Sequence, residues 1–168
     1  MKAYCWFFAI TVLAVWQAFS GEIGTHQWGS GTNNVQMSVS LKGGQKEIET
    51  NQPLILSILI RNVSTNATFI LPLMNWIEAD PGFSIVVISP TGKDVSPKPK
   101  IGAHGSADLA ALGPNQSIKR EFNLGSLCKL NEIGTYRIIM KRQVWFSQEE
   151  KAFQVVSNPL DVHVVSLQ

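Results

Sequence analysis

Apolar and polar residues alternate with a period of two along most of this chain, beginning near position 35. The alternation is plain in residues 35–41, where Val-Gln-Met-Ser-Val-Ser-Leu places each apolar side chain two positions from the next. Successive side chains of a β-strand point to opposite faces, so this spacing predicts a strand with one buried face. The sequence has no stretch of a dozen residues in which apolar side chains recur three and four positions apart, as they do in a helix. The alternation therefore predicts an all-β fold.

Further strands are predicted at short intervals. Residues 54–63 are apolar on both faces and rich in β-branched residues, which predicts a central strand entered at Pro53. Pro90-Thr91-Gly92 predicts a tight turn, because proline presets the first turn angle and glycine supplies a positive φ. Other strands are expected at residues 46–50 (a short edge strand), 67–71 (ended by Pro72), 83–89, 117–124, 134–142, 152–156 and 160–165. Seven to eight strands at this spacing predict an immunoglobulin-like two-sheet antiparallel sandwich over residues 35–168.

Residues 90–116 lack a regular pattern and are rich in Pro, Gly, Lys and Ser. We expect one long irregular connection there, with a short helical turn near residues 107–112.

Residues 1–20 have the three parts of a secretory signal. Lys2 gives the positive start, residues 3–19 are almost unbroken apolar sequence, and Ala18-Phe19-Ser20 places small residues at the positions required for cleavage before Gly21. The alternative is an uncleaved anchor, although 17 residues are few for a hydrocarbon core of about 30 Å. We expect a secreted, periplasmic or cell-surface protein with no membrane span after signal cleavage. Residues 21–34 contain four glycines and predict a flexible lead-in.

The balance of charge restricts the class of partner. Fourteen Lys and Arg against twelve Asp and Glu give a net charge of +2, and Lys2 lies in the predicted signal. Nucleic-acid binders neutralise phosphates with a strong positive excess, so no nucleic-acid partner is expected. A near-neutral chain is also not attracted to anionic membranes. The expected partner is an extracellular protein or a glycan.

The C-terminal half resembles a known architecture. Residues 122–130, a strand followed by a short crossing turn, precede Gly134-Thr135-Tyr136, and this arrangement resembles the tyrosine corner of immunoglobulin-like sandwiches. The resemblance implies that the Tyr136 hydroxyl bonds the backbone of the crossing loop while its ring fills the core edge. From Gly113 to Pro159, the pattern is similar to small immunoglobulin-like accessory domains of secreted proteins. Similar signatures occur in the N-terminal domain of deuterolysin-type metallopeptidases and in BsuPI-type proteinase-inhibitor domains. The resemblance covers about a third of the chain and implies architecture rather than function.

Catalytic and metal-binding patterns are weak. His104-Gly105-Ser106-Ala107-Asp108 contains the residue types of a hydrolase triad, but triad members normally come from separate elements, so these neighbours predict a solvated turn. His26, His104 and His163 are far apart and no His-Glu-x-x-His motif occurs. We therefore expect no catalytic residue, no metal, no cofactor and no enzymatic activity.

Cys128 is the one cysteine left after cleavage of the signal, so no intramolecular disulfide can form. Its neighbours Leu127 and Leu130 predict a small buried hydrophobic residue under the corner rather than a reactive thiol.

The aromatic residues are the candidates for binding. Trp76 is expected in the loop of residues 72–82, and Trp145 and Phe146 in the loop of residues 143–150. Such rings offer flat apolar faces to sugars or protein partners, and the alternative is that they cap the open end of the core. The predicted function is an exported, non-catalytic binding or accessory domain. The alternative is a secreted proteinase inhibitor that uses the loop of residues 93–116.

Overall fold

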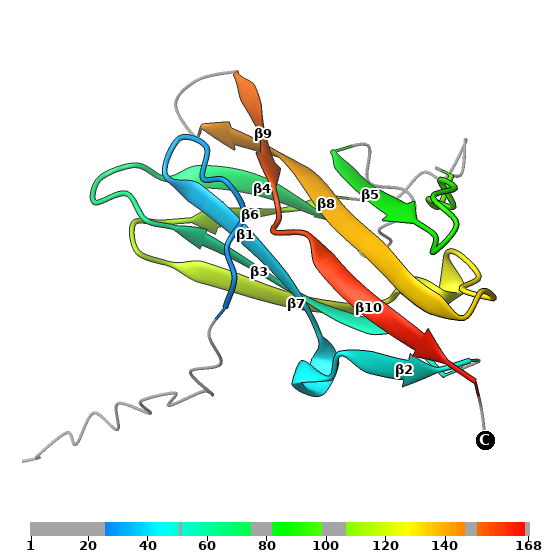
Figure 1. Ribbon diagram of the computed structural model, residues 1–168. Coiled ribbons are helices and arrows are strands. Elements are labelled where there is room, and N and C mark those ends of the chain that lie inside the picture. The colour runs from blue at the N-terminus through cyan, green and yellow to red at the C-terminus, as the bar shows by residue number, and fades with distance from the viewer. Residues whose placement is uncertain (1–25, 51, 75–81, 99–106, 147–150, 167–168) are drawn as a thin grey trace, which may run out of the picture.

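The computed structural model describes residues 26–50, 52–74, 82–98, 107–146 and 151–166, and this part of the chain is built from β-strands (Figure 1). The strands are β1 (Val35–Leu41), β2 (Glu47–Glu49), β3 (Ile55–Asn62), β4 (Phe69–Met74), β5 (Phe83–Ile88), β6 (Ala107–Leu112), β7 (Ser117–Asn123), β8 (Gly134–Phe146), β9 (Ala152–Val156) and β10 (Leu160–Val165). Two short 3-10 helices follow β1 and β7, namely η1 (Lys42–Gly44) and η3 (Leu124–Ser126).

The strands form two sheets that pack as an immunoglobulin-like sandwich (Figure 1). One sheet has three strands in the order β1-β3-β7, and the other has seven, with β2-β10-β8-β4-β6 as its main path. The long strand β8 organises the larger sheet. Its first half pairs with β10 and β5, and its second half pairs with β9 and β4. The all-β sandwich predicted from the sequence is therefore confirmed.

The core follows the alternation in the sequence. On β3, Leu56, Ile58 and Ile60 point inward and are buried, and on β8 the inward positions include Ile138 and Met140, each with 0% exposure. Both sheets turn every second residue toward the other sheet, so apolar surface from both is removed from water. That burial is the main stabilising contribution to the fold.

Residues 107–112 form strand β6, so the predicted helical turn at these positions is wrong. Their sequence, Ala-Asp-Leu-Ala-Ala-Leu, contains good helix formers. Antiparallel pairing with β4 over all six residues provides backbone partners that the sequence pattern did not reveal, and Leu112 is fully buried. Tertiary pairing thus outweighs local helix propensity here.

The predicted connection over residues 90–116 is also shorter than expected. Besides β6, its described part includes Val95, whose N–H donates to the Val87 carbonyl (2.9 Å), and Ser96, whose hydroxyl accepts from the Val87 N–H (2.9 Å). The chain therefore continues the sheet beside β5 before it reaches residue 99.

Four other features of the strands differ from the prediction. The described residues form ten strands rather than seven to eight, and β2 pairs with β10 in parallel, not antiparallel. Strand β8 continues to Phe146 instead of ending at residue 142. Strand β4 continues through Pro72, which was expected to end it. Beyond Ile70, β4 has a neighbouring strand on one side only among the described residues, and proline is tolerated on an unpaired strand side.

Buried Asn62 joins the two sheets at one end of the sandwich. Its side-chain nitrogen donates to the carbonyls of Ala67 (2.7 Å), Leu112 (3.1 Å) and Gly113 (2.9 Å). Its side-chain oxygen accepts from the Ser64 N–H (2.8 Å). A strand of the smaller sheet therefore fixes the end of β6, which belongs to the larger sheet.

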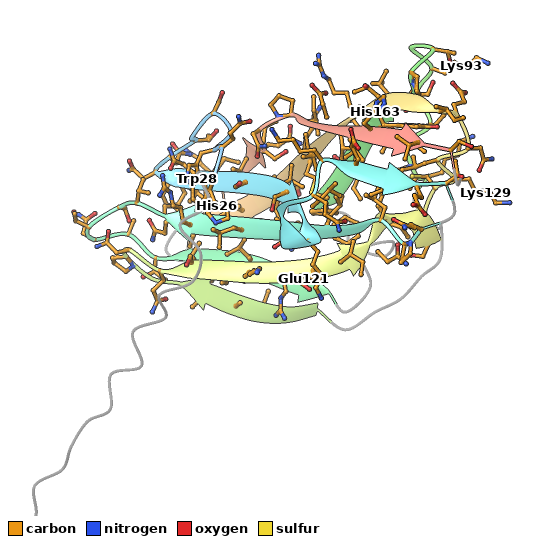
Figure 2. The ribbon with its side chains drawn as sticks, turned by 60° about the horizontal axis from the view of Figure 1, so that its bottom comes forward. His26, Trp28, Lys93, Glu121, Lys129 and His163 are labelled. Atoms are coloured by element: carbon orange, nitrogen blue, oxygen red, sulfur yellow. The ribbon has the colours of Figure 1, made fainter. Side chains whose placement is uncertain are left out.

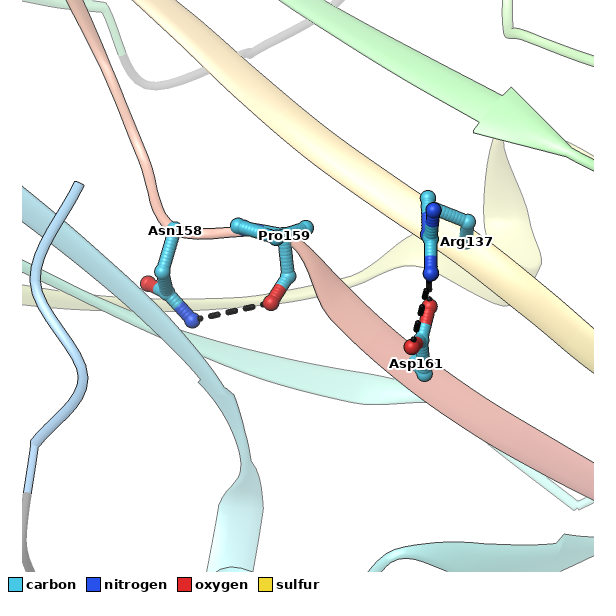
Figure 3. A network of polar contacts seen from close by, with 4 residues as sticks. All are labelled: Arg137, Asn158, Pro159 and Asp161. Carbon is cyan, nitrogen blue, oxygen red and sulfur yellow. Dashed lines mark hydrogen bonds and ion pairs between the residues drawn. The ribbon is translucent and has the colours of Figure 1, made fainter. Parts of the chain in front are cut away.

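Buried Asn158 performs a similar role between β9 and β10. It accepts from the Val39 N–H (2.8 Å) and donates to the Val39 carbonyl (3.2 Å), so its amide covers part of the outer edge of β1. Asn158 also donates to the Pro159 carbonyl (3.2 Å), while on the neighbouring strands the exposed Arg137 and Asp161 form an ion pair (Figure 3).

Candidate functional site

The structure separates the aromatic residues that the sequence nominated for binding. Trp145 and Phe146 belong to the end of β8 rather than to a loop, and successive strand positions face opposite sides. Phe146 packs inward, with its ring centroid 5.0 Å from that of Phe69 and 5.3 Å from that of Phe153. Trp145 lies on the outer face and is half-buried. Trp76 lies outside the described residues.

Trp145 belongs to a line of apolar residues across the outer face of the larger sheet. Ala152 is directly opposite Trp145, Trp145 is opposite Ile70, and Ile70 is opposite Ala111. Directly opposed residues of antiparallel strands share a face and lie side by side. Leu109, two positions from Ala111 on β6, continues the line. These five residues are called the apolar row below. The row crosses β9, β8, β4 and β6, the strands labelled in Figure 1.

Burial shows that the apolar row points away from the core. The neighbouring positions Val144, Phe69 and Leu112 are inward and have 0% exposure. In the row itself, Leu109 is 70% exposed. Ala111 and Ala152 are exposed, and Ile70 and Trp145 are half-buried. Adjoining apolar side chains on an outer sheet face are typical of a surface that binds another molecule.

The apolar row ends at β6, which is an edge strand of the larger sheet among the described residues. Strand β6 pairs with β4 on one side and, within the part of the chain that the structure describes, with no strand on the other. Edge strands commonly carry charges that prevent unwanted pairing. Strand β7, at the edge of the smaller sheet, has Lys119, Arg120 and Glu121 in succession, whereas β6 has one charged residue, Asp108.

A second cluster lies on the outer face of the three-stranded sheet. The Arg61 Nε donates to the Gln36 Oε1 (2.8 Å), and the Arg61 guanidinium carbon lies 3.7 Å from the centroid of the Trp28 ring. The sequence reasoning missed this cluster because it assigned Trp28 to a flexible lead-in. The spacing that could have revealed it is the alternation of β1 and β3, which places Gln36 and Arg61 on outward positions.

Glycine at position 29 allows this part of the lead-in to contact the sandwich. An added Cβ there would lie 2.0 Å from the Val156 carbonyl oxygen, so only glycine fits without movement of the backbone. The Gly29 N–H donates to the Met37 carbonyl (3.0 Å). These contacts tie the described part of the predicted lead-in to β1 and β9.

Tyr136 occupies the position that the resemblance to a tyrosine corner implies. Its ring has 1% exposure, and its hydroxyl accepts from the Glu132 N–H (2.8 Å). Burial raises the pKa of the Tyr136 hydroxyl, which stays neutral at physiological pH. Nearby, burial raises the pKa of the half-buried Cys128 thiol to about 11, so little reactive thiolate forms near neutral pH.

The described residues do not place three or more His, Cys, Asp or Glu side chains where they could hold a metal ion. His163 contacts the Thr135 hydroxyl (3.2 Å) on the neighbouring strand, while His104 and Ser106 lie outside the described residues. Among the helices that the structure describes, none has the length and hydrophobicity needed to cross a bilayer.

No family model matches the chain, and no curated protein matches it. Several solved structures are similar in outline. The Northeast Structural Genomics Consortium target SoR45 has a TM-score of 0.49 at 12% identity, with 83% of this chain and 95% of that chain covered. The ASH/PapD-like domain 7 of human CEP192 has a TM-score of 0.42 at 10% identity, with 80% and 87% covered. A β-glucosidase from Listeria innocua has a TM-score of 0.40 at 16% identity, and the match covers 83% of this chain but only 17% of the enzyme. Likeness at this level identifies neither a ligand nor a partner.

Proposed function

We propose that this chain is an exported, non-catalytic binding module that holds a protein partner on the apolar row. The observation that carries the proposal is the register: Ala152, Trp145, Ile70 and Ala111 are opposed across four strands and all point outward. Leu109 extends the same surface to the edge of the sheet with 70% of its area exposed.

The chemistry of the apolar row favours a protein over a sugar. Sugar hydroxyls need hydrogen-bonding partners, and the side chains of the row offer one such group, the Trp145 indole N–H. Protein contacts, in contrast, are commonly centred on a large aromatic anchor surrounded by smaller apolar groups. Trp145 supplies the anchor, and the small side chains of Ala152 and Ala111 leave room for a partner to approach on both sides.

Export is the second part of the proposal and is supported by the sequence of residues 1–20. Lys2, the apolar stretch and Ala18-Phe19-Ser20 form a cleavable signal. N-terminal sequencing of the protein recovered outside the producing cell is expected to begin at Gly21. Recovery of an intact N-terminus in the membrane fraction would instead support an uncleaved anchor.

Site-specific photo-crosslinking in the producing organism tests the binding surface. A photoreactive amino acid at position 109 is compared with one at position 119, an exposed site on the charged edge strand β7. We expect an adduct with one recurring protein from position 109 and none from position 119. Replacing the Trp145 anchor with Ala in the position-109 protein should lower the adduct yield roughly tenfold. Equal yields from both positions, or no effect of the Trp145 substitution in a folded variant, would contradict the proposal.

A further inference from the structure

We infer that the outer face of the three-stranded sheet carries a second binding site, in which Arg61 receives the carboxylate of an acidic sugar. This site is separate from the apolar row, because it lies on the other sheet and is formed by Trp28, Gln36, Arg61 and Ser117. The inference does not depend on the proposed protein partner.

The site begins with a fixed glutamine. Gln36 and Arg61 are directly opposed on β1 and β3. The Gln36 side chain lies against Gly31, where an added Cβ would be 3.1 Å from the Gln36 Cγ and 3.3 Å from its Nε2. This close approach holds the amide so that its oxygen accepts from the Arg61 Nε at 2.8 Å.

Arg61 is held on two sides. Gln36 occupies its Nε, and the Trp28 ring lies 3.7 Å from the guanidinium carbon. Stacking on an aromatic face and one fixed hydrogen bond together restrict the rotation of a long side chain, so less entropy is lost when a ligand binds. Among the described residues, none accepts a hydrogen bond from the two terminal nitrogens of Arg61. These nitrogens form the planar fork that pairs with both oxygens of a carboxylate.

Arg61 also has no counter-charge on its own face among the described residues. Its direct neighbours across the strands are the neutral Gln36 and Ser117. The acidic residue of this face, Glu121, is already 2.9 Å from the Lys42 ammonium and 3.7 Å from that of Lys119. Figure 2 shows Trp28 beside His26 near β1 and Glu121 on β7. Within the part of the chain that the structure describes, the charge of Arg61 is therefore left available for an external anion.

The groups around Arg61 favour a sugar as the carrier of the carboxylate. Ser117 is exposed, and its hydroxyl lies on the same face as Arg61. The Gln36 amide has a donor that its bond to Arg61 does not use. A hexuronic acid presents one carboxylate and several hydroxyls within a single ring, which matches a guanidinium fork flanked by a hydroxyl and an amide.

Titration with trigalacturonate, followed by NMR, tests the site in the full mature chain. We expect saturable shifts of the Arg61 side-chain N–H and the Trp28 indole N–H. The methyl-esterified trisaccharide, which lacks the carboxylates, should cause no such shifts. Acetate should bind more weakly, because it has no hydroxyls. Equal binding of the acid and its ester, or acetate binding as tightly as trigalacturonate, would overturn the assignment of an acidic sugar.

Substitutions locate the site. Arg61→Lys keeps the charge but removes the fork, so the affinity should fall roughly tenfold. Arg120→Lys is the matched control, because Arg120 is an exposed arginine on β7, and it should bind as the unaltered protein does. Gln36→Ala leaves Arg61 intact and should weaken binding by releasing the guanidinium. Trp145→Ala, which disrupts the apolar row, should leave the affinity for trigalacturonate unchanged. Unchanged affinity in Arg61→Lys would show that only general charge is involved, and an equal loss in Arg120→Lys would show that the effect is not specific to Arg61. Either result would overturn the site.

Discussion

The outer faces of the two sheets differ in chemistry although both sheets follow the same alternation. On the three-stranded sheet, the outward positions include Gln36, Arg61 and Glu121, which are engaged in hydrogen bonds, ion pairs or stacking. On the seven-stranded sheet, the outward positions of the apolar row have no charge, and Leu109 is 70% exposed. The inward positions of both sheets are mostly apolar and buried.

This difference shows that the fold constrains the side chains of the inner faces but not those of the outer faces. Folding requires apolar side chains on the inner faces, because their burial supplies most of the stabilisation. Outer faces are under no such requirement, and an exposed apolar row is unfavourable for a protein that must remain dissolved. This contrast supports the proposal that the apolar row is a contact surface and that the polar face binds a hydrophilic ligand.

The largest expected effect separates two neighbouring aromatic residues of β8. Phe146→Ala should lower the free energy of unfolding by about 3 kcal/mol, because Phe146 packs against Phe69 and Phe153. Trp145→Ala should cost about 1 kcal/mol, because Trp145 lies on the outer face. Urea unfolding of both variants measures the difference. Equal losses would contradict the placement of the two rings on opposite faces.

Asn62 tests how the two sheets are connected beside the apolar row. Asn62→Ala should cost about 2 kcal/mol, because the Ser64 N–H and the carbonyls of Leu112 and Gly113 lose a partner. The exposed Asn66 is the matched control, and Asn66→Ala should change stability by less than about 0.5 kcal/mol. Thermal unfolding of both variants measures this difference in stability. An Asn62 variant as stable as the control would show that β6 is held by β4 alone.

Arg61 should matter less for stability than for binding. Arg61→Gln removes the stack on Trp28 and one hydrogen bond, and we expect a loss of about 0.5–1 kcal/mol in the free energy of unfolding. Arg120→Gln should have almost no effect. A loss of several kcal/mol in Arg61→Gln would identify the cluster as a structural element that fixes the N-terminal segment.

The smallest expected effect is a response to acid at Glu121 on the polar face. Hydrogen bonding to Lys42 lowers the pKa of the exposed Glu121 carboxyl. Any stability from this ion pair is complete above the carboxyl's ordinary pKa and is lost as the pH falls through the lowered value. NMR titration should show the Glu121 midpoint below that of a free glutamate, and Lys42→Gln should raise it. An unchanged midpoint in that variant would contradict the ion pair, while the apolar row has no side chain that titrates in this range.

The prediction from sequence succeeded where a local pattern decides the outcome. Residues 35–41 alternate and form β1, and the apolar residues 54–63 contain the central strand β3. Residues 107–112 show why other predictions failed, because Ala and Leu suit both helix and strand and the decision came from pairing with β4. The end of β8 was missed for a related reason, since Trp145 and Phe146 acquire their partners from β4 and β9.

The candidate sites were harder to predict than the fold. Trp145 was nominated from its residue type, but its neighbours in the apolar row are distant in sequence, and nothing local indicates that Ile70 or Ala111 lies beside it. Trp28 was not nominated at all, because it precedes the first alternating segment. Its contact with Arg61 depends on the path of residues 28–32 over the sandwich.

The sequence by itself determined which side chains of each strand face inward, because a period of two assigns alternate residues to opposite sides wherever a strand forms. Only the tertiary structure decided which outward residues became neighbours. Strand order and register result from the packing of the whole sandwich, and a shift of one residue in register would move every outward side chain to the other face. Both candidate sites depend on register, so neither could be read from any single segment of the chain.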